Sequence, residues 1–320
     1  MGWISDAYSN GQARKAAMKG KVVVITGGTS GIGKVAAERL AGMGARIVLV
    51  ARDKARGQAT IERLRHRAPG IGHSVHYADL SRLAHMKKVA AEIAAAEPRV
   101  DVLINNAGAM FNTRHVTEDG LELTFATNHV AYFVVTHGLR ERLLASAPAR
   151  VVNTSSDAHR IATLDFDDLQ SEKGYHLSLK EWLSVGGASG FKVYARSKLA
   201  NILFTRELAR RFAGTGVTAN CFHPGFVATR FGDESGGWAA HMIRFWKNII
   251  AISPEKGAET MVYLASSPEV ANASGLYFYK CRPATPTKEA QDDAAARRLW
   301  LETARLAGIS GLTFLCADIG

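Results

Sequence analysis

A tyrosine and a lysine stand four positions apart in this chain, at Tyr194 and Lys198. Side chains at this spacing lie on one face of a helix, so the ammonium group can favour the phenolate form of the tyrosine. The pKa of a tyrosine is normally about 10, and we expect the lysine to lower it toward a working range. Such a tyrosine can pass a proton to or from an alcohol or carbonyl oxygen.

A glycine-rich turn near the start of the chain gives this pair a context. Gly27, Gly31 and Gly33 follow a β-branched apolar run at residues 21–26, which predicts a parallel strand buried on both faces. Between such a strand and a helix, glycines let the backbone approach a pyrophosphate that lies on the helix N-terminus. The turn therefore predicts a dinucleotide site, although its spacing differs from the G-x-G-x-x-G form.

The end of the second predicted strand bears on which dinucleotide binds. An NAD site carries an acidic residue there for the ribose 2′-hydroxyl, whereas this chain has Ala51 with Arg52 beside it. A guanidinium pairs with a 2′-phosphate and offers a diol much less, so Arg52 favours NADP(H). Alternatively, Arg52 caps the strand and Asp53 contacts the ribose, which leaves NAD(H) open.

Two further sets of polar or small residues follow predicted strands. Asp79 comes directly after the third strand, where it can meet the adenine ring; a helix N-cap shared with Ser81 is the other interpretation, and the two roles are compatible. Asn106, Ala107 and Gly108 end the fourth strand and let a cofactor lie against the backbone. An ordinary strand-to-loop turn is the alternative, but the carboxyl end of a central strand favours the cofactor site.

Predicted strands and helices alternate along the chain. The strands are expected at residues 21–26, 46–50, 74–78, 100–104, 150–153 and 217–222, and the main helices at residues 55–67, 120–144, 191–212 and 289–306. Amphipathic spacing from Leu83 predicts one more helix that ends before Pro98. This alternation predicts an α/β fold, a single-domain Rossmann-type doubly wound parallel sheet with helices on both faces.

No break in composition marks a second domain. We expect an N-terminal extension over residues 1–20, the Rossmann-type domain over 21–285, and a C-terminal helix and tail over 286–320 that pack on it. Two substrate-side insertions, residues 157–190 and 231–252, depart from the alternation. The second is apolar and aromatic with scattered basic residues, which suits a lid over a lipophilic substrate or a membrane-contacting surface. A helix packed on the core or on a partner subunit is the alternative.

Composition and charge exclude several classes of protein. The net charge of +11 comes from basic residues spread over predicted helices, which favours a solvated surface over nucleic-acid binding. An anionic lipid surface or an acidic partner is the alternative. Three separated cysteines without a CxxC pair indicate a reducing cytoplasm and no disulfide framework or zinc site. His129, His159 and His223 lack ligand spacing, so we expect hydrogen-bonding or surface roles and no metal.

The chain resembles the short-chain dehydrogenase/reductase family from about residue 21 to beyond Tyr277. The resemblance is carried by TGGTSGIG at residues 26–33, NNAG at 105–108, HPGFVATR at 223–230, and Asn128, Ser156, Tyr194 and Lys198. Within the family it is most similar to the retinol-dehydrogenase-like branch, through residues 127–130, 151–160, 194–201 and 295–300.

The resemblance implies a catalytic role for each matching position. Tyr194 is the acid in reduction and the base in oxidation, Lys198 lowers its pKa and binds the nicotinamide ribose, and Ser156 polarises the substrate carbonyl. Ser155 should point the opposite way, because side chains alternate along a strand. Asn128 would sit in the long helix and hold a water that feeds protons through Lys198.

The resemblance also implies a cofactor site that supplies the hydride chemistry. Thr229, after Pro224 and Gly225, would bind the nicotinamide carboxamide. The complete set of expected cofactor-binding residues is Gly27, Thr29, Ser30, Gly31, Ile32, Gly33, Arg52, Asp79, Leu80, Asn106, Ala107, Gly108, Tyr194, Lys198, Pro224, Gly225, Val227 and Thr229.

The expected activity is NADP(H)-dependent interconversion of a carbonyl and an alcohol on a hydrophobic substrate, such as a retinoid, a steroid or an aromatic compound. Reduction of a C=C bond is one alternative, because light-dependent chlorophyll-precursor reductases resemble this branch and use cysteine chemistry, for which Cys221 is the candidate. A nucleotide-binding regulator without turnover is another, against which the intact set of Asn128, Ser156, Tyr194 and Lys198 argues.

The start of the chain bears on its location. Residues 1–20 are polar and lack a continuous apolar core, so they predict neither a signal peptide nor a membrane span. The resemblance implies that membrane-bound relatives carry an N-terminal anchor, which is missing here. We therefore expect a cytoplasmic enzyme with weak peripheral membrane contact, and the family resemblance leaves a homo-oligomer open.

Overall fold

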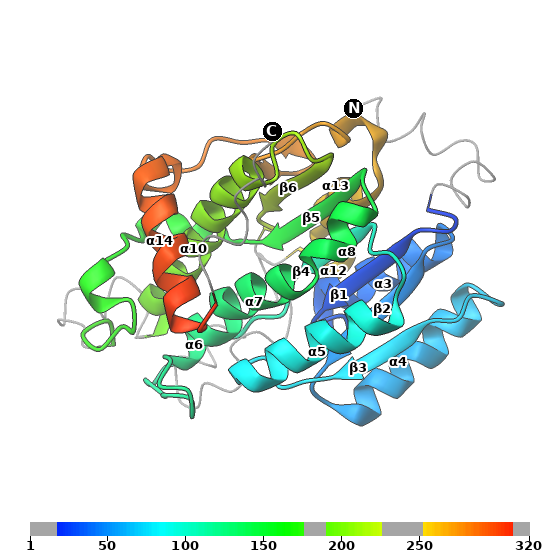
Figure 1. Cartoon of the computed structure of the whole chain (residues 1–320), viewed down its shortest axis with the longest axis horizontal. Coiled ribbons are helices and arrows are strands. Elements are labelled where there is room, and N and C mark those ends of the chain that lie inside the picture. Colours follow the sequence, from blue (N-terminus) through cyan, green and yellow to red (C-terminus); the bar gives the residue numbers. More distant parts are fainter. Residues whose placement is uncertain (1–17, 176–189, 226–251, 310–320) are drawn as a thin grey trace, which may run out of the picture.

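Apolar runs in the sequence form the strands of one sheet at the centre of the protein (Figure 1). The computed structural model describes residues 18–175, 190–225 and 252–309. Its strands are β1 (Val22–Thr26), β2 (Arg46–Ala51), β3 (Ser74–Tyr77), β4 (Val102–Asn105), β5 (Ala149–Thr154), β6 (Val217–Phe222), β7 (Tyr277–Tyr279) and β8 (Arg282–Pro283).

The strands are ordered β3-β2-β1-β4-β5-β6-β7-β8, and each neighbouring pair is parallel except β7 and β8. The order reverses between β1 and β4, which creates the crevice where doubly wound sheets bind ligands. The predicted fold class and the first six strands are confirmed. The sequence did not predict β7 and β8, which are only three and two residues long.

Each face of the sheet buries its own apolar cluster, because side chains alternate along a strand. Along β1, Val22 and Val24 belong to one cluster, whereas Val23 and Ile25 belong to the other. The helices of the described chain are α3 (Gly31–Gly42), α4 (Lys54–Arg67), α5 (Leu83–Ala96), α6 (Leu123–Phe125), α7 (Ala131–Gly138), α8 (Arg140–Ala145), α10 (Gly190–Arg211), α12 (Pro254–Gly257), α13 (Glu259–Ser266) and α14 (Asp293–Leu306). The first cluster includes residues of α5, α7, α10 and α14, and the second includes residues of α3, α4 and α13.

The prediction of a single helix over residues 120–144 is wrong, because this segment is interrupted. It is divided into α6, a π-helical turn η1 (Ala126–Val130), α7 and α8. The carboxylate of Glu122 accepts hydrogen bonds from the backbone of Thr124 and Phe125, which fixes the start of α6. At the other break, a Cβ atom on Gly138 would lie 2.5 Å from the Cβ of Ala90, so this glycine lets α7 approach α5 closely.

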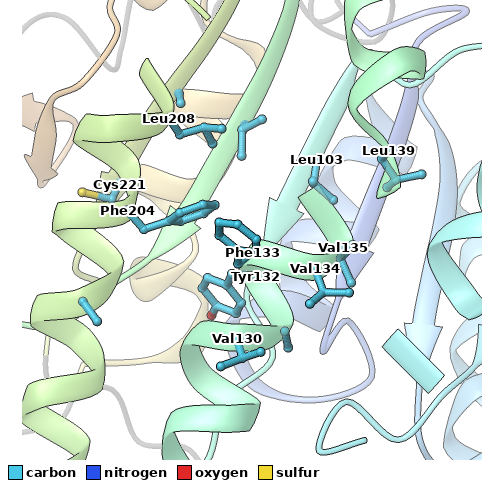
Figure 2. Packing of buried hydrophobic residues seen from close by; sticks show 14 of the residues in the cluster. Leu103, Val130, Tyr132, Phe133, Val134, Val135, Leu139, Phe204, Leu208 and Cys221 are labelled. Carbon is cyan, nitrogen blue, oxygen red and sulfur yellow. The ribbon is translucent and has the colours of Figure 1, made fainter. Parts of the chain in front are cut away.

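Helix α14 lies against α10 at the edge of the first cluster (Figure 1). The ring of Trp300 contacts the rings of Phe133 and Phe204, with centroids 4.8 and 5.8 Å apart. Figure 2 shows Phe133 and Phe204 meeting between α7 and α10. The guanidinium of Arg211 also lies over the Trp300 ring, 4.4 Å from the ring centroid. The C-terminal segment thereby reaches the same core as the tyrosine helix.

Four of the predicted segments, residues 1–20, 157–190, 231–252 and 286–320, fall partly outside the described structure. Most of residues 231–252 and the second half of residues 157–190 are not described, so the interpretation of 231–252 as a lid stays a prediction. The first half of residues 157–190 contains two short 3-10 turns, η2 (Asp157–Ile161) and η3 (Phe166–Asp168). Among the helices that are described, none combines the length and apolarity that crossing a bilayer requires.

Candidate active site

The carboxyl ends of β1, β4, β5 and β6 bring the predicted site residues to one edge of the sheet. The glycine turn follows β1, Asn106 to Gly108 follow β4, Ser156 follows β5, and Pro224 and Gly225 follow β6. Helix α10 carries Tyr194 and Lys198 into the same region. The structure thus gathers residues that are up to about 200 positions apart in the sequence.

The turn after β1 requires glycine for steric reasons. Gly27 and Gly31 have φ angles of +68° and +52°, which residues with a Cβ atom rarely adopt. A Cβ atom on Gly33 would lie 2.4 Å from the carbonyl oxygen of Gly27 and 2.5 Å from the side-chain nitrogen of Asn106. The turn is therefore packed against its own backbone and against the loop after β4.

A set of hydrogen bonds joins the turns after β1 and β4. The hydroxyl of Thr26 accepts hydrogen bonds from the backbone of Asn106 at 2.9 Å and of Ala107 at 3.1 Å. In return, the side-chain amide of Asn106 donates to the carbonyls of Thr26 and Gly27 at 3.2 and 3.1 Å. The Asn106 side chain therefore connects the turn after β1 to the turn after β4.

The N-terminus of α3 fits a bound pyrophosphate. Ser30 is its N-cap residue, yet the Ser30 side chain makes no capping hydrogen bond, and the first turn of α3 contains no acidic residue. Backbone N–H groups at such an end lack partners within the helix and favour an anion. Thr29 is half-buried, Ser30 is exposed, and Ile32 is buried beneath them. The residues present therefore fit a dinucleotide.

The two charged residues after β2, Arg52 and Asp53, have different surroundings. The Asp53 carboxylate caps α4 by accepting a hydrogen bond from the backbone of Arg56 at 2.9 Å. Arg52 is exposed at the end of the strand. Burial tends to raise the pKa of Asp79, but hydrogen bonds from Ser81 and the charge of Arg52 outweigh it, so the net shift is downward. The two charges thus face the same region beyond β2 and β3.

The alternative that Asp79 caps the helix after β3 is wrong. One oxygen of Asp79 accepts hydrogen bonds from the backbone and hydroxyl of Ser81 at 3.0 and 2.8 Å, which closes a local turn. The first backbone N–H of α5, that of Leu83, donates instead to Asp119 at 2.8 Å. Leu80, in the turn between them, is buried.

The two adjacent serines after β5 face different partners. The Ser155 hydroxyl is buried and donates to the carbonyl of Lys198 at 2.8 Å, which ties the strand to α10. The Ser156 hydroxyl is half-buried, accepts a hydrogen bond from the backbone of Ala158 at 3.2 Å, and lies near enough to the Tyr194 side chain to lower the pKa of its phenol. The alternation of strand side chains thus places only the second serine beside the tyrosine.

The expected lowering of the tyrosine pKa is not found. Burial raises the pKa of Tyr194 to about 12, and the neighbouring Ser156 hydroxyl only partly opposes this shift. Burial also lowers the pKa of Lys198 to about 7. Its Nζ atom lies 5.5 Å from the centroid of the Tyr194 ring and donates to the carbonyl of Thr154 at 3.2 Å. Desolvation is the largest influence on both groups, and it favours the neutral phenol and the neutral amine.

Asn128 is fully buried in the π-helical turn η1 rather than in a regular helix. Its side-chain oxygen accepts from the backbone of Ala109 at 2.8 Å, and its amide donates to the carbonyl of Ala109 and the hydroxyl of Ser197. A Cβ atom on Gly108 would lie 3.1 Å from this side-chain oxygen and 3.5 Å from the Nζ atom of Lys198. The asparagine therefore ties the loop after β4 to α10.

The loop after β6 enters the site only in part. Pro224 and Gly225 are half-buried, and the backbone of Gly225 donates to the ring nitrogen Nδ1 of His223 at 3.2 Å. Val227 and Thr229 lie outside the described residues. Cys221 is buried within β6, where burial raises the pKa of its thiol to about 12.

The histidines near the site serve the protein interior. His129, His159 and His223 are all buried, so the surface role considered for them is wrong. Each makes hydrogen bonds within the protein, as the sequence also predicted. Within residues 18–175, 190–225 and 252–309, no group of three or more histidine, cysteine or acidic side chains could hold a metal ion.

Sequence reasoning did not single out Thr26, Thr154 or Asn201, each of which holds part of this site. Thr26 joins the turns after β1 and β4, and the carbonyl of Thr154 contacts Lys198. Asn201 donates to the same carbonyl at 3.1 Å. Its position three residues after Lys198 was the available signal, because that spacing shares a helix face.

Comparison with known proteins identifies the family. Residues 21–165 match the family model described as short chain dehydrogenase, and residues 167–276 match one described as Enoyl-(Acyl carrier protein) reductase. Retinol dehydrogenase 13 of Homo sapiens is 39% identical over 302 residues, which cover 92% of this chain and 87% of that protein. The chain belongs to the short-chain dehydrogenase/reductase family. Retinol dehydrogenase 12 of Homo sapiens is also 39% identical, over 91% of this chain and 88% of its own length.

Solved structures share the fold. An uncharacterized protein from Mycobacterium Paratuberculosis superimposes with a TM-score of 0.69 at 30% identity, covering 91% of this chain and 94% of that one. The Pseudomonas aeruginosa RhlG/NADP active-site complex has a TM-score of 0.63 at 25% identity, covering 83% and 96%. The chain is thus an NAD(P)-dependent dehydrogenase/reductase of alcohols or carbonyls, in the retinol-dehydrogenase-like branch.

The packing of the glycine turn leads to a prediction for Gly33→Ala. The new methyl group must displace the Gly27 carbonyl, so we expect the free energy of unfolding to fall by about 1–3 kcal/mol. Because that carbonyl belongs to the dinucleotide turn, the Kd for NADPH should rise at least about tenfold, a loss of about 1.4 kcal/mol. Urea denaturation and a fluorescence titration with NADPH measure the two quantities.

Gly42→Ala, at the other end of α3, is the matched control. A Cβ atom there would lie 3.4 Å from its nearest neighbour, the Nε atom of Arg67, which is an ordinary contact. Alanine also has the higher helix propensity, so stability should stay the same or rise by up to about 1 kcal/mol. Equal effects of the two substitutions would contradict the steric account of the turn.

Proposed function

We propose that this enzyme uses NADP(H) to interconvert a carbonyl and an alcohol on a hydrophobic substrate, with Tyr194 as proton donor and acceptor. The observation that carries the proposal is that the Ser156 hydroxyl lies near the Tyr194 side chain and acts on its pKa, with Lys198 buried beside them. Two hydroxyl groups that meet at the carboxyl edge of the sheet can both donate to one substrate oxygen.

The residues of this chain divide the work of holding the cofactor. The glycine turn and the N-terminus of α3 would receive the pyrophosphate, Arg52 the 2′-phosphate, and Lys198 the nicotinamide ribose. Pro224 and Gly225 begin the loop that would border the nicotinamide. When bound, the cofactor supplies or accepts the hydride.

The proton is handled by Tyr194. Because its pKa is raised to about 12, the phenol is protonated at neutral pH and is ready to donate in the direction of reduction. Ser156 accepts a hydrogen bond from the backbone of Ala158, and in the substrate complex its O–H group would donate to the substrate oxygen. In oxidation the same phenol oxygen must receive a proton, so the charged form of Lys198 assists that direction.

The preference for NADP(H) is supported by the residues after β2. Asp53 is the residue that could have supplied an acid for the ribose diol, but its carboxylate caps α4. The exposed Arg52 remains as the charged group beside the expected 2′-phosphate. A solved relative at 25% identity is described as an NADP complex, which agrees with this assignment.

The substrate class is inferred from the relatives. Several of them are named retinol dehydrogenases, and retinol is a lipophilic alcohol whose oxidation gives an aldehyde. A retinoid-like, steroid-like or aromatic carbonyl compound is therefore the substrate class that we propose. The free thiols of Cys221 and Cys281 accord with the reducing cytoplasm as its location.

Reduction of a C=C bond is a less favoured activity. The description of the family model that matches residues 167–276 points toward it. The cysteine chemistry of that alternative would need a reactive thiolate, whereas burial holds the pKa of the Cys221 thiol at about 12. The carbonyl–alcohol reaction uses the hydroxyl groups that are in place.

A substrate panel combined with Tyr194→Phe tests the proposed chemistry. Retinoid, steroid and aromatic aldehydes and ketones are assayed with NADPH and with NADH by following absorbance of the reduced nicotinamide. We expect turnover of at least one class, and a loss of kcat of about 100-fold or more in Tyr194→Phe, because a positioned acid contributes about 10²–10⁴. The Kd for NADPH should remain within about twofold, since the ring is preserved.

Two results would overturn parts of this account. Near-normal kcat in Tyr194→Phe would refute the proton-transfer role. Binding of NADPH without turnover of any substrate in the panel would support a regulatory nucleotide-binding protein instead. Turnover restricted to enones, with retention of the carbonyl group, would favour the C=C reductase.

Arg52→Ala tests the cofactor preference. Removing a charge-assisted contact to the 2′-phosphate should raise the KM for NADPH about tenfold or more and leave the KM for NADH within about twofold. Arg63→Ala is the control, because Arg63 lies on α4 and pairs with Glu38 at 3.3 Å. An unchanged ratio of kcat/KM for the two dinucleotides in Arg52→Ala would refute the assignment.

A further inference from the structure

A buried amide controls the surroundings of the active-site lysine. Asn201 lies three residues after Lys198 on α10 and is completely buried. Its Nδ2 group donates to the backbone carbonyl of Asn128 at 2.9 Å and to that of Thr154 at 3.1 Å. The Thr154 carbonyl also accepts the hydrogen bond from the Nζ atom of Lys198 at 3.2 Å. One side chain thus fixes both the π-helical turn and the carbonyl that binds the lysine.

The two donors of Asn201 determine how its oxygen is paired. With both N–H groups directed to carbonyls, the side-chain oxygen faces the Nδ1 atom of His129 at 3.4 Å. An amide oxygen only accepts, so His129 must carry its proton on Nδ1. The other ring nitrogen, Nε2, then accepts from the hydroxyl of Thr303 at 2.9 Å. Burial lowers the pKa of His129 to about 4, which keeps the ring neutral.

These hydrogen bonds form a series in which each side chain donates to the next. The hydroxyl of Thr303 donates to His129, and His129 donates to Asn201. Asn201 donates to the carbonyl of Asn128 and to the Thr154 carbonyl that binds Lys198. All three side chains are at most 1% exposed. Every polar side-chain atom of these three residues has a hydrogen-bond partner. An unpaired polar atom at this depth would lower the stability of the folded protein.

A second set of bonds fixes the backbone of Asn201. The hydroxyl of Thr205 donates to the Asn201 carbonyl at 2.7 Å and accepts from the amide of Asn153 on β5 at 3.0 Å. The amide of Asn105 on β4 in turn donates to the side-chain oxygen of Asn153 at 2.9 Å. The position of Asn201 is therefore set from the sheet as well as from α14.

We propose that Asn201 is a positioning residue for Lys198, and that Thr303 on α14 acts on the active site through His129. This inference rests on the proposed function of Lys198 and Tyr194. Thr303 is 174 positions from His129 in the sequence, and α14 reaches it because Trp300 anchors the helix on Phe133 and Phe204. Without the Thr303 hydroxyl, His129 can change tautomer or rotate, and the Asn201 amide loses its fixed orientation.

Thr303→Val tests the proposal, because it removes the hydroxyl and keeps the shape of the side chain. We expect kcat to fall about five- to tenfold, the effect of one weakened hydrogen bond, while the KM for the dinucleotide stays within about twofold. Thr303→Ser restores the hydroxyl and should return kcat to within about twofold of the wild type. Thermal unfolding shows that each variant is folded at the assay temperature.

Thr60→Val is the matched control for a buried threonine. Its hydroxyl is equally buried and donates to the carbonyl of Arg56 at 2.9 Å on α4, away from α10. We expect stability to fall as in Thr303→Val, with kcat unchanged. An equal loss of kcat in both variants would show that the effect of Thr303 is general destabilisation, and would overturn the proposal.

A double-mutant cycle tests whether the residues act in series. Asn201→Leu should lower kcat more than Thr303→Val does, and adding Thr303→Val to it should cause no further loss. Independent, multiplying effects would overturn the proposed chain, as would a kcat that Thr303→Val leaves unchanged while the wild type turns over substrate. If the wild type binds NADPH and turns over nothing, the proposed function fails first, and the role of Asn201 fails with it.

Discussion

The buried amine of Lys198 is the constraint on which the site depends. Burial strips water from this group and lowers its pKa to about 7, and the carbonyl of Thr154 provides its hydrogen bond. The amine also lies 5.8 Å from the centroid of the Tyr132 ring and 5.5 Å from that of Tyr194. With a pKa near neutral pH, this lysine gains or loses its charge when the pH changes slightly around 7.

The elements around the lysine follow from the need to keep these partners in place. The end of β5 supplies the Thr154 carbonyl, and α10 supplies the lysine and the tyrosine. The π-helical turn η1 brings Asn128 against the hydroxyl of Ser197 on α10. Such turns interrupt helices and frequently occur at functional sites. The asparagines and threonines between β4, β5 and α10 form hydrogen bonds with one another, which connect the two strands to the helix.

Much of this arrangement could be predicted from local sequence patterns. Buried parallel strands, the glycine turn and the tyrosine helix each have a pattern that depends on neighbouring residues only. The division of the helix over residues 120–144 could not be predicted in this way. It depends on the close approach of Gly138 to Ala90 and on the capping carboxylate of Glu122, which are properties of packing.

The prediction that the pKa of Tyr194 is lowered was wrong for a related reason. Helix spacing correctly placed Tyr194 and Lys198 on one face, but spacing says nothing about how deeply either group is buried. Burial shifts the pKa values of both groups so that their neutral forms are favoured. Similarly, the hydrogen bonds of Asn201 join segments that only the folded chain brings together.

The charge state of Lys198 is the most direct test of this account. Titration of the labelled lysine Nζ groups by NMR, with the Lys198 signal assigned by its loss in Lys198→Arg, measures its pKa in the folded protein. We predict a midpoint near the value of about 7 that burial produces. A midpoint near the ordinary lysine value of 10.5 would show that the amine remains solvated and would contradict the account.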